Sequence, residues 1–237
     1  MQKKLIAWSV HAFTASGLLS AFMALLAAVD EDWRACMFWL LLCFVIDGVD
    51  GTFARLFKVR EVLPHVQGKY IDYVIDFFTY VILPAYLFYQ TTSLSRGMLL
   101  TATFAMLLSS ALYYGIENMT SADGKHFMGF PALWNLVVYL LIFVFPDLSP
   151  TLTFCVIILL AIGHFVQILF AYPSQGGRWW PITLAATCIF IGAAIINVWY
   201  YPKAMAWSRW LSIISASYFV VLSLVDTFFP AKPRLQA

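Results

Sequence analysis

Residues 47–76 read DGVDGTFARLFKVREVLPHVQGKYIDYVID and separate two long apolar runs of the chain. The stretch holds two pairs of aspartates, Asp47 with Asp50 and Asp72 with Asp76. Spacings of three and four residues place both members of a pair on one face of an α-helix. A carboxylate deep in a membrane helix costs about 2.5–3.5 kcal/mol even on the lenient insertion scale. A chain that keeps four of them at the facing ends of two helices must therefore use them.

The linker between the two pairs is long enough to turn the chain round, so two antiparallel helices could bring all four carboxylates together. Converging carboxylates repel one another in a poorly solvated place unless cations lie between them. Mg²⁺, Mn²⁺ or Ca²⁺ suit an all-oxygen ligand set better than zinc does. We therefore expect a site for two divalent ions, an arrangement that recurs in phosphoryl transfer. The alternative, solvated helix ends beside a basic loop, explains neither the paired spacing nor Gly48 and Gly51.

The same stretch resembles the signature of the CDP-alcohol phosphotransferases, D-x2-D-G-x2-A-R followed by G-x3-D-x3-D. The matching residues are Asp47, Asp50, Gly51, Ala54, Arg55, Gly68, Asp72 and Asp76. The gap between Arg55 and Gly68 is longer here than in most of the family. This gap, the doubled Asp-Gly of DGVDG and the later GFPALWN (129–135) resemble the bacterial phosphatidylcholine synthase branch, which joins CDP-diacylglycerol to free choline.

The resemblance implies a role for each motif residue. The expected ligands of two Mn²⁺ or Mg²⁺ ions are Asp47, Asp50, Asp72 and Asp76. The expected contacts of CDP-diacylglycerol are Asp47, Gly51, Arg55 and Gly68. Asp76 would also accept the proton of the attacking choline hydroxyl, and the Arg55 guanidinium would hold the diphosphate. The alternatives are an interfacial anchor for Arg55 and simple packing for the glycines.

Composition sets the fold class. Hydrophobic residues make up 62% of the chain and charged residues 11%, which indicates an all-α, polytopic integral membrane protein. We expect eight transmembrane helices in one domain over residues 1–237, at about 5–28, 35–56, 68–90, 97–116, 131–145, 151–171, 181–200 and 208–228. The resemblance implies the family's six-helix core and a homodimer. The first apolar run could instead be a signal peptide, but it is longer than a typical one.

Basic residues set the expected orientation. With eight spans and a cytoplasmic amino terminus, ten lie on the inner side: Lys3, Lys4, Arg55, Lys58, Arg60, Lys69, Lys125, Arg178, Lys232 and Arg234. Four lie on the outer side: Arg34, Arg96, Lys203 and Arg209. This positive-inside bias places both termini and the four aspartates at the cytoplasmic face. The expected location is the bacterial inner membrane, with the lipid bilayer as a partner and no nucleic acid.

Choline recognition would rely on aromatic faces, because a quaternary ammonium has no N–H to donate. The candidate contacts are Tyr113, Tyr114, Glu117, Trp134 and Asn135. They would lie at the cytoplasmic ends of the helices at 97–116 and 131–145, although aromatic belts at membrane interfaces are common. Polar residues inside apolar runs are predicted to be interhelical hydrogen-bond partners: His11, His164, Gln167 and Asn197.

Three other functions stay open. The acceptor could be another alcohol, such as serine, inositol phosphate or glycerol phosphate. A phosphorylated acceptor would favour a basic cluster near the motif, and basic residues elsewhere on the inner side are sparse. A cation transporter would place carboxylates near mid-bilayer and often in inverted repeats. A membrane scaffold would have no use for the aspartate motif.

Overall fold

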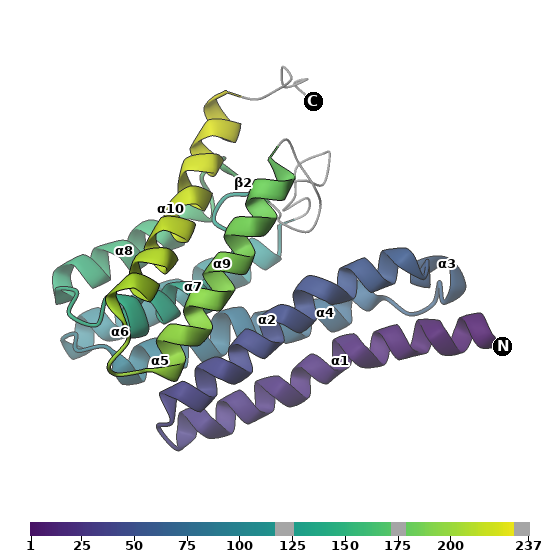
Figure 1. The fold of residues 1–237 in the computed structure, drawn as a ribbon, viewed down its shortest axis with the longest axis horizontal. Helices are drawn as coiled ribbons and strands as arrows, with labels where there is room; N and C mark the ends of the chain where they lie inside the picture. Colours follow the sequence, from purple (N-terminus) through teal and green to yellow (C-terminus); the bar gives the residue numbers. More distant parts are fainter. Residues whose placement is uncertain (117–125, 172–178, 230–237) are drawn as a thin grey trace. The chain divides into compact units, whose positions relative to one another are not determined.

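The computed structural model describes residues 1–116, 126–171 and 179–229 of the chain. Nearly all elements are helices (Figure 1), which confirms the predicted all-α class. The chain divides into two compact units, with the boundary between Leu87 and Phe88.

Unit 1 begins with a helical hairpin. α1 (Gln2–Val29) and α2 (Trp33–Leu56) run side by side (Figure 1), joined by a short polar turn. The Asp32 carboxylate caps α2 by accepting the Ala35 N–H at 2.9 Å. The buried face of α1 consists mostly of small residues: Ala7, Gly17, Ser20, Ala21, Ala24 and Ala28. Small residues let the backbones of membrane helices approach closely, which sets how α1 packs against its neighbours.

The rest of unit 1 returns the chain along this hairpin. After the short α3 (Val59–Val62), α4 (Gly68–Asp76) packs against α1 and continues through a π-helical segment, η1 (Phe77–Ile82), into α5 (Leu83–Thr91). The linker therefore reverses the chain, as its length predicts.

Unit 2 holds the remaining helices and two short strands. The helices are α6 (Arg96–Tyr114), α7 (Trp134–Tyr139) with η2 (Leu140–Val144), α8 (Pro150–Gly163), α9 (Trp180–Trp199) and α10 (Ala206–Phe228). The strands β1 (His126–Met128) and β2 (Leu169–Ala171) pair antiparallel, with Phe127 opposite Phe170. α9 and α10 lie side by side (Figure 1), and α6 packs against α8.

Two helix boundaries differ from the expected ones. The helix expected at 151–171 ends at Gly163, because the Gly163 carbonyl accepts the Phe130 N–H at 2.9 Å and the chain turns into β2. The helix expected at 131–145 begins at Trp134, since Ala132 has a left-handed backbone with φ of 55°. Both differences arise where residues 129–132 cross the end of α8.

Six helices within the described ranges are long and apolar enough to cross a membrane: Gln2–Val29, Trp33–Leu56, Gly68–Thr91, Arg96–Tyr114, Trp180–Trp199 and Ala206–Phe228. The other two expected spans are shorter apolar helices, Trp134–Val144 and Pro150–Gly163. A helix needs about 20 residues to span the hydrocarbon core, so these two are too short to cross it as straight helices. The chain is a polytopic membrane protein.

Buried polar side chains of unit 2 bond to one another. The Asn197 amide donates to the Tyr139 hydroxyl at 2.8 Å and accepts from the Ser208 hydroxyl at 2.6 Å. His164 pairs with Ser110. The predicted hydrogen-bonding roles of Asn197 and His164 are confirmed, whereas Gln167 lies exposed in the turn after α8 rather than inside a helix.

We predict that Gly129→Ala destabilises the protein. Gly129 has a φ of 78°, and a Cβ there would clash with the His164 carbonyl group. The backbone strain alone costs about 1–3 kcal/mol, and the clash adds to it. The control is Gly192→Ala in α9, where a Cβ meets nothing within 4 Å and helix propensity favours alanine. Thermal unfolding in detergent, followed by size-exclusion chromatography, should show a lower midpoint for Gly129→Ala alone, and equal midpoints would contradict the prediction.

Candidate metal centre and active site

Three segments of unit 1 enclose one small cavity. The aspartates of α2 and α4 all line it: Asp47, Asp50, Asp72 and Asp76. Thr14 and Gly17 of α1 close one side. The volume is about 10 Å³, close to the room that one water molecule or ion needs. The structure thus brings together both carboxylate pairs of the motif.

Three of the four carboxylates form a tight cluster. One oxygen each from Asp47, Asp50 and Asp72 lies within 4.8 Å of the other two. Oxygens that share one ion at ligand distances of 2.0–2.6 Å lie at most about 4–5 Å apart, so these three fit a single hard cation. Asp50 is buried, with 7% of its surface exposed, and the other two are half-buried. The cluster could therefore hold a divalent cation.

Glycines let helices and side chains approach the cluster. A Cβ at Gly17 would lie 3.4 Å from the Ile75 side chain, so α1 sits directly against α4 at the level of the cavity. A Cβ at Gly51 would lie 3.4 Å from Nη1 of Arg55, whose Nη2 donates to the Thr52 hydroxyl at 3.1 Å. The Arg55 guanidinium therefore lies folded back along α2, beside Gly51, the residue that follows Asp50.

Gly68 faces α1. A Cβ at Gly68 would lie 2.9 Å from Cε1 of His11, closer than packed atoms approach. A side chain at this position would displace the imidazole ring. The space that Gly68 leaves is thus occupied by His11.

Two of the aromatic residues expected to bind choline, Tyr113 and Trp134, pack together with Phe130 around another side chain of unit 2. The ring centroids of Tyr113, Phe130 and Trp134 lie 5.0, 5.1 and 5.7 Å from that of His164. His164 Nδ1 donates to the Phe130 carbonyl at 2.5 Å, so Nε2 is the acceptor for the Ser110 hydroxyl at 3.3 Å. The imidazole fills the space between these three rings.

The other expected choline contacts differ in exposure. Asn135 is buried, and its side-chain oxygen accepts the Leu136 N–H at 2.9 Å. Tyr114 is half-buried and meets Tyr113 edge-on, with ring centroids 6.4 Å apart. Glu117 lies outside the described residues.

No family model matches the chain. Individual proteins do match it, and these matches cover nearly the whole length of this chain and of each relative. The chain is 36% identical to the phosphatidylcholine synthase of Pseudomonas aeruginosa over 219 residues, which cover 92% of this chain and 90% of that protein. The chain belongs to the phosphatidylcholine synthase family. The phosphatidylcholine synthase of Rhizobium johnstonii is 34% identical over 228 residues, covering 96% and 93% of the two chains. That of Borreliella burgdorferi is 29% identical over 231 residues, covering 97% of each.

Tyr80 is a further residue of the candidate site that the aspartate motif does not include. The buried Tyr80 hydroxyl donates to Asp47 Oδ2 at 2.6 Å. Tyr80 lies four residues after Asp76, and Asp76 lies four residues after Asp72. This repeated spacing is the one sign in the sequence that Tyr80 shares a helix face with the two aspartates. Tyr80 falls in η1, whose wider turns advance fewer degrees per residue than an α-helix and so keep Tyr80 aligned with the two aspartates. Tyr80 therefore orients one carboxylate of the cluster.

We predict that Tyr80→Phe weakens divalent-cation binding about 10- to 100-fold, the usual effect of losing a hydrogen bond that orients a ligand. Mn²⁺ titration of the purified protein, followed by electron paramagnetic resonance, measures this affinity. Tyr70→Phe is the control, because Tyr70 lies in α4, which continues into η1, and has 67% of its surface exposed. An unchanged Mn²⁺ affinity in Tyr80→Phe would show that Asp47 needs no such support.

Proposed function

We propose that the chain transfers a phosphatidyl group from CDP-diacylglycerol to choline, giving phosphatidylcholine and CMP. The observation that carries this proposal is the convergence of four motif aspartates on one cavity, in a chain related along its length to phosphatidylcholine synthases. In this proposal residues 1–237 constitute one catalytic domain, which acts as a homodimer.

The aspartates would divide into two roles. Asp47, Asp50 and Asp72 have the spacing of a cation site, and Asp76 would complete the ligands of a second ion. Bound Mn²⁺ or Mg²⁺ would offset the negative charge of the diphosphate and of the departing CMP. Hard cations with carboxylate ligands are the class that this donor set fits, because every ligand atom is an oxygen.

Asp76 would act as the general base. Its carboxylate lines the same cavity but stands outside the three-residue cluster. It would take the proton of the choline hydroxyl while the oxygen bonds to the phosphorus that carries diacylglycerol. The bond between that phosphorus and the CMP oxygen breaks in line. The exposed Arg55, whose guanidinium lies beside Gly51, would hold the diphosphate. Gly51 and Gly68 would be further contacts of CDP-diacylglycerol.

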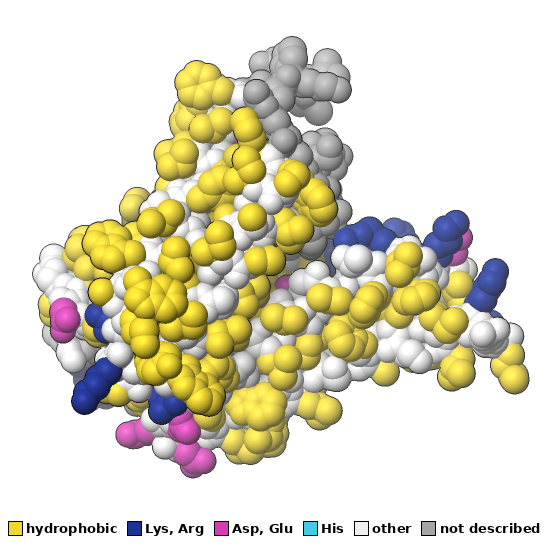
Figure 2. Space-filling view, in the orientation of Figure 1, with side chains coloured by type: hydrophobic (Ala, Val, Ile, Leu, Met, Phe, Trp, Pro, Cys, Tyr) yellow, Lys and Arg dark blue, Asp and Glu magenta, His cyan; other side chains and the backbone are white. Residues whose placement is uncertain are grey.

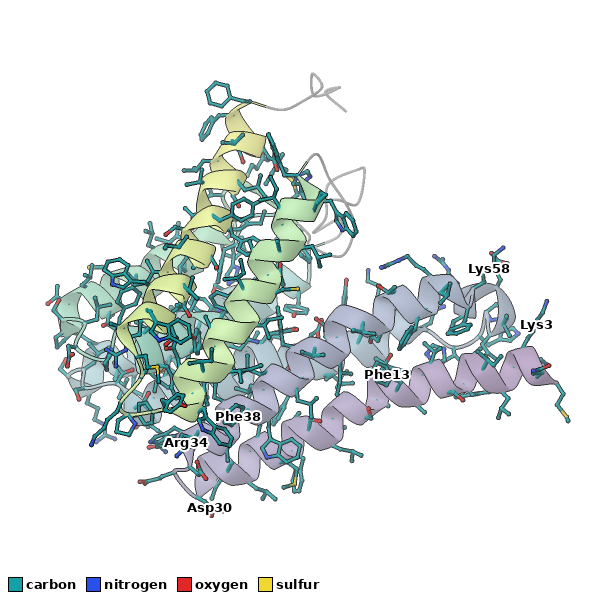
Figure 3. The ribbon with its side chains drawn as sticks, in the orientation of Figure 1. Lys3, Phe13, Asp30, Arg34, Phe38 and Lys58 are labelled. Atoms are coloured by element: carbon teal, nitrogen blue, oxygen red, sulfur yellow. The ribbon has the colours of Figure 1, made fainter. Side chains whose placement is uncertain are left out.

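The reaction would take place at the cytoplasmic face of the inner membrane. Basic side chains gather at the end of unit 1 that carries the amino terminus and α3 (Figure 2). Lys3 and Lys58 lie at this end, and Asp30 and Arg34 lie at the opposite end of the α1–α2 hairpin (Figure 3). Positive charge favours the cytoplasmic side. The water-soluble choline and CMP would enter and leave there.

The proposed choline contacts are the expected ones: Tyr113, Tyr114, Glu117, Trp134 and Asn135. Tyr114 is the aromatic member whose ring stays partly accessible, since Tyr113 and Trp134 are buried against His164. An accessible aromatic face attracts a quaternary ammonium through its quadrupole.

The acceptor is tested on purified protein in detergent with CDP-diacylglycerol, Mn²⁺ and a panel of radiolabelled alcohols. We expect CMP release and a labelled phospholipid with choline. Release with serine, inositol phosphate or glycerol phosphate in place of choline would assign the same chemistry to another acceptor. Release with none of them would contradict the proposed activity.

We predict that Asp76→Asn abolishes turnover while CDP-diacylglycerol still binds. The amide cannot take a proton from the choline hydroxyl, but the Asp47, Asp50 and Asp72 cluster remains. Initial rates of CMP release and equilibrium binding of the donor lipid measure the two effects separately. Asp147→Asn, an exposed carboxyl after α7 and η2, should keep the normal rate. A near-normal rate in Asp76→Asn would show that another group is the base.

A further inference from the structure

Three residues of α1 face α4 at helical spacing: His11, Thr14 and Gly17. Thr14 and Gly17 border the aspartate cavity, and Gly17 lies against Ile75. His11 lies against Gly68, the first residue of α4. Three residues advance about 4.5 Å along a helix, so His11 is about one turn from the cavity, toward the end of unit 1 where Lys3 and Lys58 lie.

The imidazole of His11 is buried against α4. The residue exposes 7% of its surface, its ring packs on the backbone of Gly68, and the Trp8 ring meets it edge-on at 6.1 Å. Its Nε2 atom is buried and has no hydrogen-bond partner. Folded proteins seldom leave a buried polar nitrogen unpaired, because losing the bonds to water is unfavourable. A partner that arrives with a ligand accounts for such an atom.

Basic residues are frequent at the end of unit 1 that lies beyond His11 (Figure 2). Lys69 directly follows Gly68, and Arg55 lies on α2 one turn beyond Asp50. The exposed Lys58 and Arg60 lie in the linker between the two helices, where Lys58 also pairs with Glu61 at 3.8 Å. Phosphate oxygens would be attracted to this basic end of unit 1.

We infer that His11 is a contact for the nucleotide end of the donor, with Nε2–H donating to a phosphate oxygen of the cytidine diphosphate. This inference rests on the proposed function. A donor whose reacting phosphorus lies at the aspartates extends the rest of its diphosphate toward the aqueous end, past the level of His11. Gly68 is then required because it leaves room for the ring that makes this contact.

The test is binding of CDP to the full-length protein in detergent with Mn²⁺, by isothermal titration calorimetry. His11→Phe keeps a flat ring against Gly68 and removes Nε2. We expect it to bind CDP about 10- to 100-fold more weakly, the range for a hydrogen bond to a charged group. Mn²⁺ affinity without nucleotide should stay unchanged, and so should CDP binding in His65→Phe, a change in the exposed linker. The inference would be overturned if His11→Phe bound CDP as tightly as the wild type. It would also be overturned if the variant lost as much affinity for Mn²⁺ as for CDP.

Two further variants of His11 test whether the Nε2 atom itself makes the contact. His11→Gln places an amide nitrogen near the position of Nε2, and His11→Asn is too short to reach it. We expect the glutamine variant to bind CDP at least about fivefold more tightly, part of the range for one hydrogen bond. Equal affinities would overturn the inference even if His11→Phe did not fold. A wild-type protein that binds CDP but forms no phosphatidylcholine would contradict the proposed function and leave these comparisons intact.

Discussion

Carboxylates that converge in a cavity the size of one water molecule repel one another, because little solvent is present to screen them. Four of them meet in unit 1, where α1, α2 and α4 pack closely. A divalent cation bound among the oxygens of Asp47, Asp50 and Asp72 would turn this repulsion into attraction. Cation binding would then favour the same arrangement of these side chains that the packing of the three helices favours.

The packing around the cluster serves to fix it. Small residues on α1 bring that helix against α4, and Gly17 and Gly68 mark two points of close approach. Tyr80 holds Asp47 through a hydrogen bond from the π-helical segment. π-Helical turns are rare and often lie at functional sites, which agrees with this position beside the aspartates. All of these contacts lie within unit 1.

Much of this could be predicted from sequence, because the deciding signals are local. Apolar runs gave the helices, and the spacing of the aspartates predicted that both pairs converge. What could not be predicted depends on contacts between residues distant in the chain. The helix expected at 151–171 ends at Gly163, because the Gly163 carbonyl accepts a hydrogen bond from the Phe130 N–H. The ring that fills the space between Tyr113, Phe130 and Trp134 belongs to His164, which no periodicity indicates. His11 could be placed in an apolar helix, but its contact with Gly68 required the fold.

We propose that the aspartate cluster holds divalent cations, and crystals of the protein soaked in Mn²⁺, with diffraction recorded at the manganese absorption edge, would test this. We expect anomalous density between the carboxylates of Asp47, Asp50 and Asp72, with a second peak near Asp76. Carboxylates that point apart, with no anomalous density between them, would contradict it.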